Sequence, residues 1–339
     1  MSQGPSGAVA NDQKVCPGAS WSKCEAVERP TAIKDLARVV VVTGVSSGIG
    51  HAIAKELIGK KFHVFGSVRK ETDAQRLRDQ FVEYFTPLLF DVTDEVAVQK
   101  AAAEVRSHMK EHTLLGLVNN AGIHVGLDAT ADLPLAKLRK QLEVNLVAQM
   151  SVIQAFLPLL GTDLTLNGKP GRILNNTSIY GSYTLPFMTA YAASKAALNA
   201  LSEGLHCELK PFGIPVIVIA PGPIKTEIWE GAVQNAQCIG HHNSPFDPFV
   251  QYSHKVARAL TEQPGWFLPA SAVGRKVCKV LTKRSPALHY VITPNWCFNW
   301  FGPVCGPKRV VNAVVTRIFG LHKTLKRGKA QTGSSVHTD

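Results

Sequence analysis

The sequence lacks the marks of several protein classes. Its seven cysteines are scattered and form no Cys-x-x-Cys pair, so we expect neither a disulfide framework nor a metal site. No apolar run is long enough to span a membrane, and residues 1–34 contain no apolar core of signal-peptide length. These absences indicate a cytoplasmic protein with reduced thiols. We interpret residues 1–34 as a mostly disordered leader.

Acidic residues are missing from the C-terminal part of the chain. The 339 residues carry a net charge of +12, yet Asp and Glu do not occur between Gln263 and Thr338. Twelve Lys and Arg residues lie between Arg275 and Lys329, so the rest of the chain is close to neutral. The positive charge therefore belongs to the C-terminal part and not to the body of the protein.

The body of the chain, residues 35–294, alternates between short β-branched runs and longer stretches with helical spacing. We expect strands at 38–43, 62–67, 86–90, 114–118, 172–176, 214–219 and 289–292, and helices at 49–58, 94–110, 135–160, 189–210 and 271–282. Such alternation is typical of βαβ units and predicts an α/β fold: a single Rossmann-like, doubly wound parallel sheet in three layers. Residues 227–269 have weak periodicity and are expected to form a mobile excursion.

A glycine turn, "TGVSSGIG", joins the first expected strand to the first expected helix. Glycines at Gly44, Gly48 and Gly50 would let the backbone approach a phosphate, and the helix N-terminus would supply partial positive charge. The spacing differs from the G-x-G-x-x-G fingerprint. The alternative is a tight connection with no ligand, but the strand–turn–helix context favours nucleotide binding.

Three further motifs stand where expected strands end. They are "NNAG" at 119–122, "NNTS" at 175–178 and "APGPIKTEI" at 220–228. In open α/β sheets, ligands bind at the carboxyl ends of the strands, so all three would face the cleft that the glycine turn opens onto. Alternatively they are ordinary turns, because Asn, Gly, Ser and Pro favour turns for local reasons.

The stretch "YAASK" places Tyr191 and Lys195 four residues apart, one above the other on a helix face. A tyrosine has a pKa of about 10, and a fixed positive charge beside it would lower that value. Such a tyrosine could exchange a proton near neutral pH. The pair alone could equally be a surface contact on an amphipathic helix.

Taken together, these motifs resemble the short-chain dehydrogenase/reductase superfamily. "TGVSSGIG", "FDVTD", "NNAG", "EVNL", "NNTSIYG", "YAASK" and "PGPIKTE" occur in the family's order and cover roughly residues 35–292. The segment "VFGSVRK" resembles the branch that includes retinol and hydroxysteroid dehydrogenases. The resemblance implies an enzyme that interconverts an alcohol and its ketone or aldehyde by hydride transfer. A dinucleotide-binding protein without turnover is the alternative from another class.

The resemblance implies four catalytic residues. Tyr191 would act as general acid/base, and Lys195 would lower its pKa and bind the nicotinamide ribose. Ser178 would hold the substrate oxygen. Asn145 would bind a water that links Lys195 to solvent. The bland alternatives are that Asn145 bends its helix and that Ser178 belongs to a turn.

The resemblance also implies a cofactor groove. Its predicted residues are Thr43, Gly44, Ser46, Ser47, Gly48, Ile49, Gly50, Arg69, Lys70, Asp91, Val92, Asn119, Ala121, Gly122, Tyr191, Lys195, Pro221, Gly222, Ile224 and Thr226. An acidic residue after the second strand suits NAD(H), whereas a basic residue there suits NADP(H). Arg69 and Lys70 favour NADP(H), although they could merely begin a solvated helix. NAD(H) stays possible if a shorter strand brings Glu71 into the groove.

Aromatic and apolar residues follow Ser178 and suggest a lipophilic substrate. Tyr180, Tyr183 and Phe187 precede Tyr191, and Trp229 lies in a segment that covers the substrate in this family. With Ser178 they predict a site for a steroid-, retinoid- or lipid-like alcohol or carbonyl compound. Alternatively they pack against neighbours or a second subunit of a homodimer or homotetramer. An NAD-dependent dehydrogenase of a small hydroxy compound is the alternative within the same class.

Residues 295–339 form a basic tail outside the common fold. On a helix, its apolar half holds Val310, Val311, Val314, Val315, Ile318, Phe319, Leu321 and Leu325, and its polar half holds Arg309, Asn312, Thr316, Arg317 and Lys323. This amphipathic extension suits peripheral binding to an intracellular membrane. Packing against its own domain or a partner subunit is the alternative. We expect no nucleic-acid partner, because no recognised binding module accompanies the charge.

Overall fold

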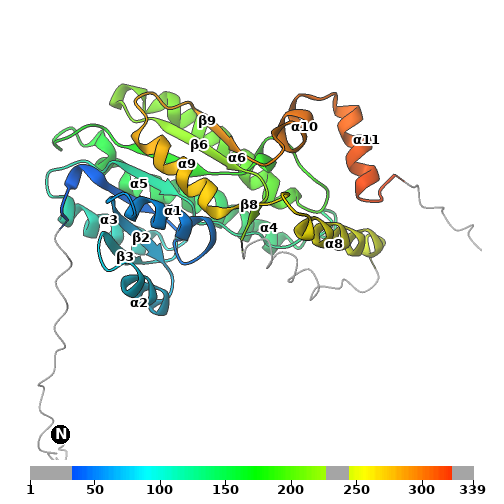
Figure 1. The fold of residues 1–339 in the computed structure, drawn as a ribbon, viewed down its shortest axis with the longest axis horizontal. Coiled ribbons are helices and arrows are strands. Elements are labelled where there is room, and N and C mark those ends of the chain that lie inside the picture. The colour runs from blue at the N-terminus through cyan, green and yellow to red at the C-terminus, as the bar shows by residue number, and fades with distance from the viewer. Residues whose placement is uncertain (1–32, 227–243, 323–339) are drawn as a thin grey trace, which may run out of the picture. The chain divides into compact units, whose positions relative to one another are not determined.

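The fold is built on one parallel β-sheet. The computed structural model describes residues 33–226 and 244–322, and Figure 1 shows how their elements are arranged. Within these residues the sheet has seven strands in the order β3-β2-β1-β4-β5-β6-β9, each parallel to its neighbours. The strands are β1 (Val39–Val42), β2 (His63–Val68), β3 (Phe85–Leu89), β4 (Gly116–Asn119), β5 (Arg172–Asn176), β6 (Val216–Pro221) and β9 (His289–Ile292). The predicted parallel sheet and its expected strands are confirmed.

The strand order reverses beside β1. The chain runs from β1 through β2 to β3, and then crosses back to place β4 on the other side of β1. Val40, for example, pairs with Val64 of β2 and with Gly116 of β4. The carboxyl ends of β1 and β4 therefore flank a topological switch point, which is where α/β sheets bind their ligands.

Helices cover both faces of the sheet and produce three layers (Figure 1). One apolar core holds side chains from α3 (Glu95–Met109), α5 (Ala148–Leu157) and α6 (Thr189–Glu208), and the core on the opposite face holds side chains from α1 (Gly48–Ile58), α2 (Glu71–Gln80) and α9 (Ala270–Thr282). The four valines of β1 are fully buried, and alternate side chains enter the two cores. This arrangement is the predicted doubly wound, Rossmann-like α/β fold.

The expected helix at 135–160 is a continuous helical stretch with two π-helical turns. It consists of α4 (Leu135–Leu142), η2 (Glu143–Val147), α5 and η3 (Pro158–Thr162). Among the described residues, this stretch is the one helix long and apolar enough to cross a membrane by length and composition. Half of its apolar window is buried inside the protein, because α5 packs on the sheet. Burial of this kind is expected of a core helix.

Helix α2 agrees with the alternative that Arg69 and Lys70 begin a solvated helix, since Lys70 is its N-cap residue, whereas α8 (Asp247–Glu262) was not expected from the sequence. Helix α8 lies in the segment predicted to be a mobile excursion, whose residues 227–243 are outside the described range. Pro248 stands in the first turn of α8, where proline is tolerated, and Ala257 packs into a satellite core with Phe187. Tertiary packing therefore stabilises a helix whose sequence period is weak. The pair β7 (Ile224–Lys225) and β8 (Leu268–Pro269) joins the two ends of this excursion.

The C-terminal part forms three short helical elements after β9. They are η6 (Cys297–Phe301), α10 (Gly302–Cys305) and α11 (Lys308–Ile318). The predicted tail helix is thus present at 308–318, while Leu325 and the last basic residues lie outside the described range. The leader predicted for residues 1–34 also lies outside it, apart from Ile33 and Lys34.

Candidate functional site

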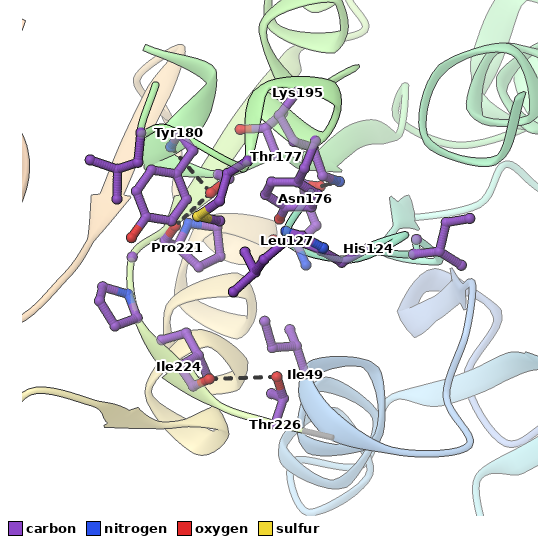
Figure 2. A pocket seen from close by; sticks show the side chains of 18 of the residues that line it. Ile49, His124, Leu127, Asn176, Thr177, Tyr180, Lys195, Pro221, Ile224 and Thr226 are labelled. Carbon is purple, nitrogen blue, oxygen red and sulfur yellow. Dashed lines mark hydrogen bonds between the residues drawn. The ribbon is translucent and has the colours of Figure 1, made fainter. Parts of the chain in front are cut away.

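A large cavity opens at the carboxyl ends of the strands. Its volume is about 1900 Å³, whereas pockets for one small ligand usually measure roughly 300–1,000 Å³. Figure 2 shows Lys195, Asn176 and Thr177 on one side of the cavity and Ile49 and Thr226 on the other. The cavity therefore offers room for a dinucleotide and a second ligand side by side.

Most of the residues predicted to bind cofactor or substrate line this cavity. They are Gly44, Ser46, Ser47, Gly48, Ile49, Gly50, Arg69, Asp91, Val92, Ala121, Gly122, Ser178, Tyr180, Tyr183, Phe187, Tyr191, Lys195, Pro221, Gly222, Ile224 and Thr226. The predicted residues Thr43, Lys70, Asn119 and Asn145 do not line it. Trp229 lies outside the described residues.

The glycine turn forms a cradle that larger residues would fill. Gly44 has a φ of +69°, and a Cβ there would stand 3.0 Å from the Cα of Ala121. A Cβ on Gly50 would overlap the carbonyl oxygen of Gly44. The turn leads into α1, whose N-cap residue Ser47 makes no side-chain cap, so the first N–H groups of the helix stay available. Available N–H groups at a helix N-terminus suit a pyrophosphate, and the residues present fit a dinucleotide.

The end of β2 carries no acidic side chain into the cavity. Ser67 is the penultimate residue of the buried strand, and its Oγ accepts a hydrogen bond from the Gly44 N–H at 2.9 Å. Arg69 lines the cavity, and its guanidinium lies 3.9 Å from the Asp91 carboxylate. The Arg69 side chain is 71% exposed and the Asp91 side chain 43%, so this long ion pair is weak and leaves the arginine available to an anion. Glu71 instead pairs with Arg78 at 2.8 Å, away from the cavity.

Two neighbouring asparagines at the end of β4 differ from the prediction. Asn119 is buried, and its Nδ2 donates to the Asn175 side chain and to the Gln149 carbonyl. Asn120 lines the cavity instead, and its Nδ2 donates to the carbonyls of Thr43 and Gly44 at 3.0 and 3.2 Å. Alternate residues of a strand point to opposite faces, so the two side chains diverge. Asn120 therefore has the place in the groove that the sequence analysis assigned to Asn119.

Thr43 acts behind the groove and does not line it. Its fully buried hydroxyl accepts hydrogen bonds from the N–H groups of Asn120 and Ala121, at 2.9 and 3.0 Å. This side chain therefore ties the end of β1 to the loop after β4. The Thr43 side chain thereby fixes the two segments that flank the switch point, the end of β1 and the loop after β4, relative to each other.

Ser178, Tyr191 and Lys195 come together at the centre of the cavity. Tyr191 and Lys195 lie on α6, and the Lys195 Nζ is 5.8 Å from the centre of the Tyr191 ring. This Nζ donates a hydrogen bond to the Asn176 carbonyl at 2.9 Å, at the end of β5. Ser178 lies two residues after that strand, and its hydroxyl accepts a hydrogen bond from the Tyr180 N–H at 3.2 Å and donates one to the Pro221 carbonyl at 3.5 Å. The four-residue spacing on the helix thus brings a phenol and an amine to the end of the adjacent strand.

The pKa values of this group follow burial. Burial raises the pKa of Tyr191, and the hydrogen bond with Ser178 only partly opposes that effect. Burial also lowers the pKa of Lys195 to about 8. The pKa of Tyr191 is thus raised, whereas the sequence predicted that Lys195 would lower it. The reason is that folding removes the phenol from water. Tyr191 is therefore protonated at neutral pH.

Asn145 lies behind the cavity in the π-helical turn η2. Its Oδ1 accepts from the Ile123 N–H at 2.8 Å, and its Nδ2 donates to the Ile123 carbonyl and to the Ser194 hydroxyl. A Cβ on Gly122 would be 3.3 Å from the Asn145 Oδ1 and 3.6 Å from the Lys195 Nζ. The Asn145 side chain therefore holds the loop after β4 against α6. Gly122 of this loop lies between Asn145 and Lys195. The local change of helix type agrees with the alternative that Asn145 distorts its helix.

Sequence reasoning missed His124, which stacks on Tyr191. The two ring centres are 4.8 Å apart, and the ring planes are inclined by 26°. The His124 Nδ1 accepts from the Gly126 N–H at 3.2 Å, and burial lowers the pKa of the ring to about 4. His124 is therefore neutral at physiological pH, so Lys195 and not His124 supplies the positive charge near Tyr191. No motif marked this histidine, because its role depends on a contact between distant segments.

Comparisons with known proteins identify relatives of this chain. The family model for short chain dehydrogenases matches residues 38–237. An NADPH-dependent 3-dehydrocapnine reductase from Ornithobacterium rhinotracheale is 36% identical over 262 residues, which cover 76% of this chain and 88% of that protein. Estradiol 17-beta-dehydrogenase 2 from Mus musculus is 36% identical over 194 residues, which cover 56% of this chain and only 49% of that protein.

A solved structure shows the same fold. A short-chain dehydrogenase from Streptomyces avermitilis superposes with a TM-score of 0.64 at 25% identity. The superposition covers 83% of this chain and 95% of that one. The resemblance inferred from the motifs, including the similarity to hydroxysteroid dehydrogenases, is therefore confirmed.

Proposed function

The chain belongs to the short-chain dehydrogenase family, and we propose that it is an NADP(H)-dependent oxidoreductase that interconverts an alcohol and its ketone or aldehyde. One observation carries the proposal. Ser178, Tyr191 and Lys195 converge between the glycine cradle and an apolar region of the same cavity. A carbonyl group bound there would meet a proton donor on one side and the dinucleotide on the other.

Tyr191 is the proton donor in this proposal. Its raised pKa keeps the phenol protonated, so it can give a proton to the carbonyl oxygen of a substrate. The Ser178 hydroxyl donates a hydrogen bond to the same oxygen and holds it in place. The dinucleotide, when bound, supplies the hydride that reduces the carbonyl carbon. In the reverse direction Tyr191 takes the proton back from the alcohol.

Lys195 stabilises the phenolate that remains after Tyr191 has given up its proton. Its Nζ is fixed by the Asn176 carbonyl, so the ammonium cannot move away from the ring. With a pKa of about 8, Lys195 can also pass a proton on near neutral pH. Asn145 positions the loop beside it, and the predicted water-mediated relay through Asn145 stays a proposal.

The phosphate-binding end supports NADP(H) over NAD(H). Arg69 lines the cavity at the end of β2, while Glu71 is held by Arg78. Because Glu71 does not line the cavity, the site offers a cation for a ribose phosphate and no carboxylate from this strand end for free ribose hydroxyls. The similarity to an NADPH-dependent reductase points in the same direction. NAD(H) is the alternative.

The substrate part of the proposal is a lipophilic alcohol or carbonyl compound. Tyr180, Phe187 and Met188 line the cavity next to Tyr191, and a relative is named for its action on a steroid. The cytoplasmic location, the homodimer or homotetramer and peripheral membrane binding stay predictions.

A panel assay of the full chain tests this function. Oxidation of NADPH and NADH is followed by absorbance with short-chain, long-chain and polycyclic aldehydes and ketones, and the reverse reaction is measured with the matching alcohols. We expect turnover of lipophilic members, with kcat/KM at least about tenfold higher for NADPH than for NADH. No absorbance change with any member would overturn the enzyme proposal, and a preference for NADH would overturn the cofactor assignment.

A further inference from the structure

We propose that the C-terminal strap, residues 296–321, forms the far wall of the substrate chamber and selects substrates with a long or bulky apolar body. The strap comprises η6, α10, α11 and the turn that follows α11. This inference rests on the proposed function and adds the element that recognises the substrate. Three observations carry it: the strap is fixed at both ends, its apolar face lines the catalytic cavity, and its basic residues point elsewhere.

The first end of the strap is tied to the loop that follows Ser178. The Tyr183 hydroxyl donates a hydrogen bond to the Asn299 carbonyl at 2.9 Å. Asn299 is only 6% exposed, and its side-chain Nδ2 donates to the Pro294 carbonyl. The hydrogen bond therefore fixes η6 to a segment five residues from the hydroxyl that holds the reacting oxygen.

The second end lands on the satellite core beside Tyr191. The Phe319 ring centre lies 6.2 Å from that of Phe187, and Phe319 and Leu321 pack against the satellite core. Gly320, with a φ of +71°, turns the chain so closely past α8 that a Cβ there would stand 3.4 Å from the Tyr252 ring. Both ends of α11 are thus connected to the body of the protein.

The apolar face of α11 lines the same cavity as Ser178 and Tyr191. Its lining residues are Val310, Val311, Val314, Val315 and Ile318, which recur with the spacing of one helix face. Val310, Val314 and Ile318 are 59%, 52% and 49% exposed, so the described residues cover these side chains only in part. An apolar ligand that covered this face would remove it from water, which favours binding.

The chamber wall also explains the polar half of the tail helix. Lys308, Arg309 and Arg317 are exposed and do not line the cavity. The amphipathic pattern that suggested membrane binding therefore has another origin: the apolar half faces the chamber and the basic half faces water. From the other side, Leu260 of α8 and Trp266 and Phe267 face the same cavity. The substrate body, continuous with the reacting carbonyl, is the occupant that this geometry fits.

Matched charge insertions on α11 test the wall. Val315→Asp places a carboxylate on the lining face, whereas Ala313→Asp places one on an exposed position that does not line the cavity. In wild-type protein we expect kcat/KM to rise from short-chain to long-chain aldehydes. Val315→Asp should reduce the long-chain value at least about tenfold, mainly through KM, and leave the short-chain value within about twofold. Ala313→Asp should change neither value, and NADPH affinity should be equal in all three proteins.

A bulky variant and a binding measurement complete the test. Val315→Trp fills the chamber without charge, so it should also lose the long-chain substrate and keep the short one, even if Val315→Asp unfolds. Binding of a long-chain alcohol, followed by tryptophan fluorescence, needs no turnover and should weaken in both Val315 variants. Equal effects of Val315→Asp and Ala313→Asp, or equal losses for short and long substrates, would contradict the proposal that α11 forms a wall of the substrate chamber. Alcohol binding that depends on Val315 in a protein without turnover would overturn the proposed function alone.

Discussion

The cavity has two halves that are built in different ways. In the cofactor half, short turns at the ends of neighbouring parallel strands bring their backbone groups together, and side chains such as Thr43 and Asn120 bind those turns to one another. In the substrate half, the wall comes from the loop around Phe187, from α8 and from α11, which meet mainly through apolar side chains, with single hydrogen bonds such as the one from the Tyr183 hydroxyl to the Asn299 carbonyl. The comparison shows that the first half is fixed by hydrogen bonds near the sheet. The second depends on packing between remote segments.

Replacing the phenol at the boundary between the halves should have the largest effect. Tyr191→Phe removes the proton donor but keeps the ring that stacks on His124. We expect turnover to fall at least about 100-fold, as for the loss of general acid/base catalysis. NADPH affinity and the thermal midpoint should change little, which calorimetry and binding titration can verify. Wild-type turnover in this variant would show that the proton comes from another group.

Removing a cation from the cofactor half should affect one cofactor selectively. Arg69→Ala deletes a charged contact, which should cost roughly 1.5–3 kcal/mol in NADPH affinity, or about 10- to 150-fold in Kd. NADH binding should hardly change. Lys70→Ala is the matched control, because this neighbouring cation does not line the cavity. The assignment is wrong if both variants, or both cofactors, are weakened equally.

The pH dependence of carbonyl reduction should report on the charge of Lys195, which lies at the boundary between the two halves of the cavity. Burial lowers the pKa of Lys195 to about 8, so the ammonium is present below that pH and is lost above it. Because this charge stabilises the Tyr191 phenolate, kcat should be level below about pH 8 and fall about tenfold per unit well above it. Arg69→Ala should keep the same pH profile, because residue 69 lies at the end of the cofactor groove that is far from Lys195. A flat profile up to about pH 10 would contradict the role of Lys195.

Vesicle binding should give the smallest effect and concerns the substrate half. With the apolar face of α11 turned to the chamber, the basic residues and the exposed rings of Trp296 and Phe301 are left for a membrane surface. Each basic residue would add about 1 kcal/mol near an anionic leaflet. Full-length protein should therefore float weakly with anionic vesicles and be released by salt. Neutral vesicles are the control. Salt-resistant binding to neutral vesicles that Val315→Asp abolishes would show that α11 inserts into lipid, which would also contradict its place in the chamber wall.

The sequence predicted the cofactor half better than the substrate half, for a physical reason. The positions of Gly44, Gly50, Tyr191 and Lys195 in the cavity depend on local backbone geometry and on residues a few positions away, so short motifs can point to them. Asn120, at the end of β4, lines the cavity in place of the predicted Asn119, because neighbouring side chains of an extended segment point to opposite faces. Helix α8 escaped notice because its stability comes from tertiary packing.

Burial also limited what the sequence could show about the reacting groups. The motif suggested a lowered pKa for Tyr191, but the depth of the phenol in the folded protein raises it. His124 stands next to that ring through a contact between the loop after β4 and α6, and no spacing in the sequence encodes it. The apolar face of α11 could be predicted from the sequence. The direction in which this face points, however, depends on the contact between Phe319 and Phe187.

The small β7–β8 pair has a consequence for how this protein can evolve. It holds together the two ends of the excursion between Lys225 and Leu268, beside the main sheet. Doubling the length of a flexible connection costs only about 0.6 kcal/mol in loop-closure entropy. Insertions between the two clamped ends can therefore accumulate while the catalytic sheet stays folded. A lineage could reshape which molecules it accepts by editing this excursion, and keep its proton chemistry and its dinucleotide unchanged.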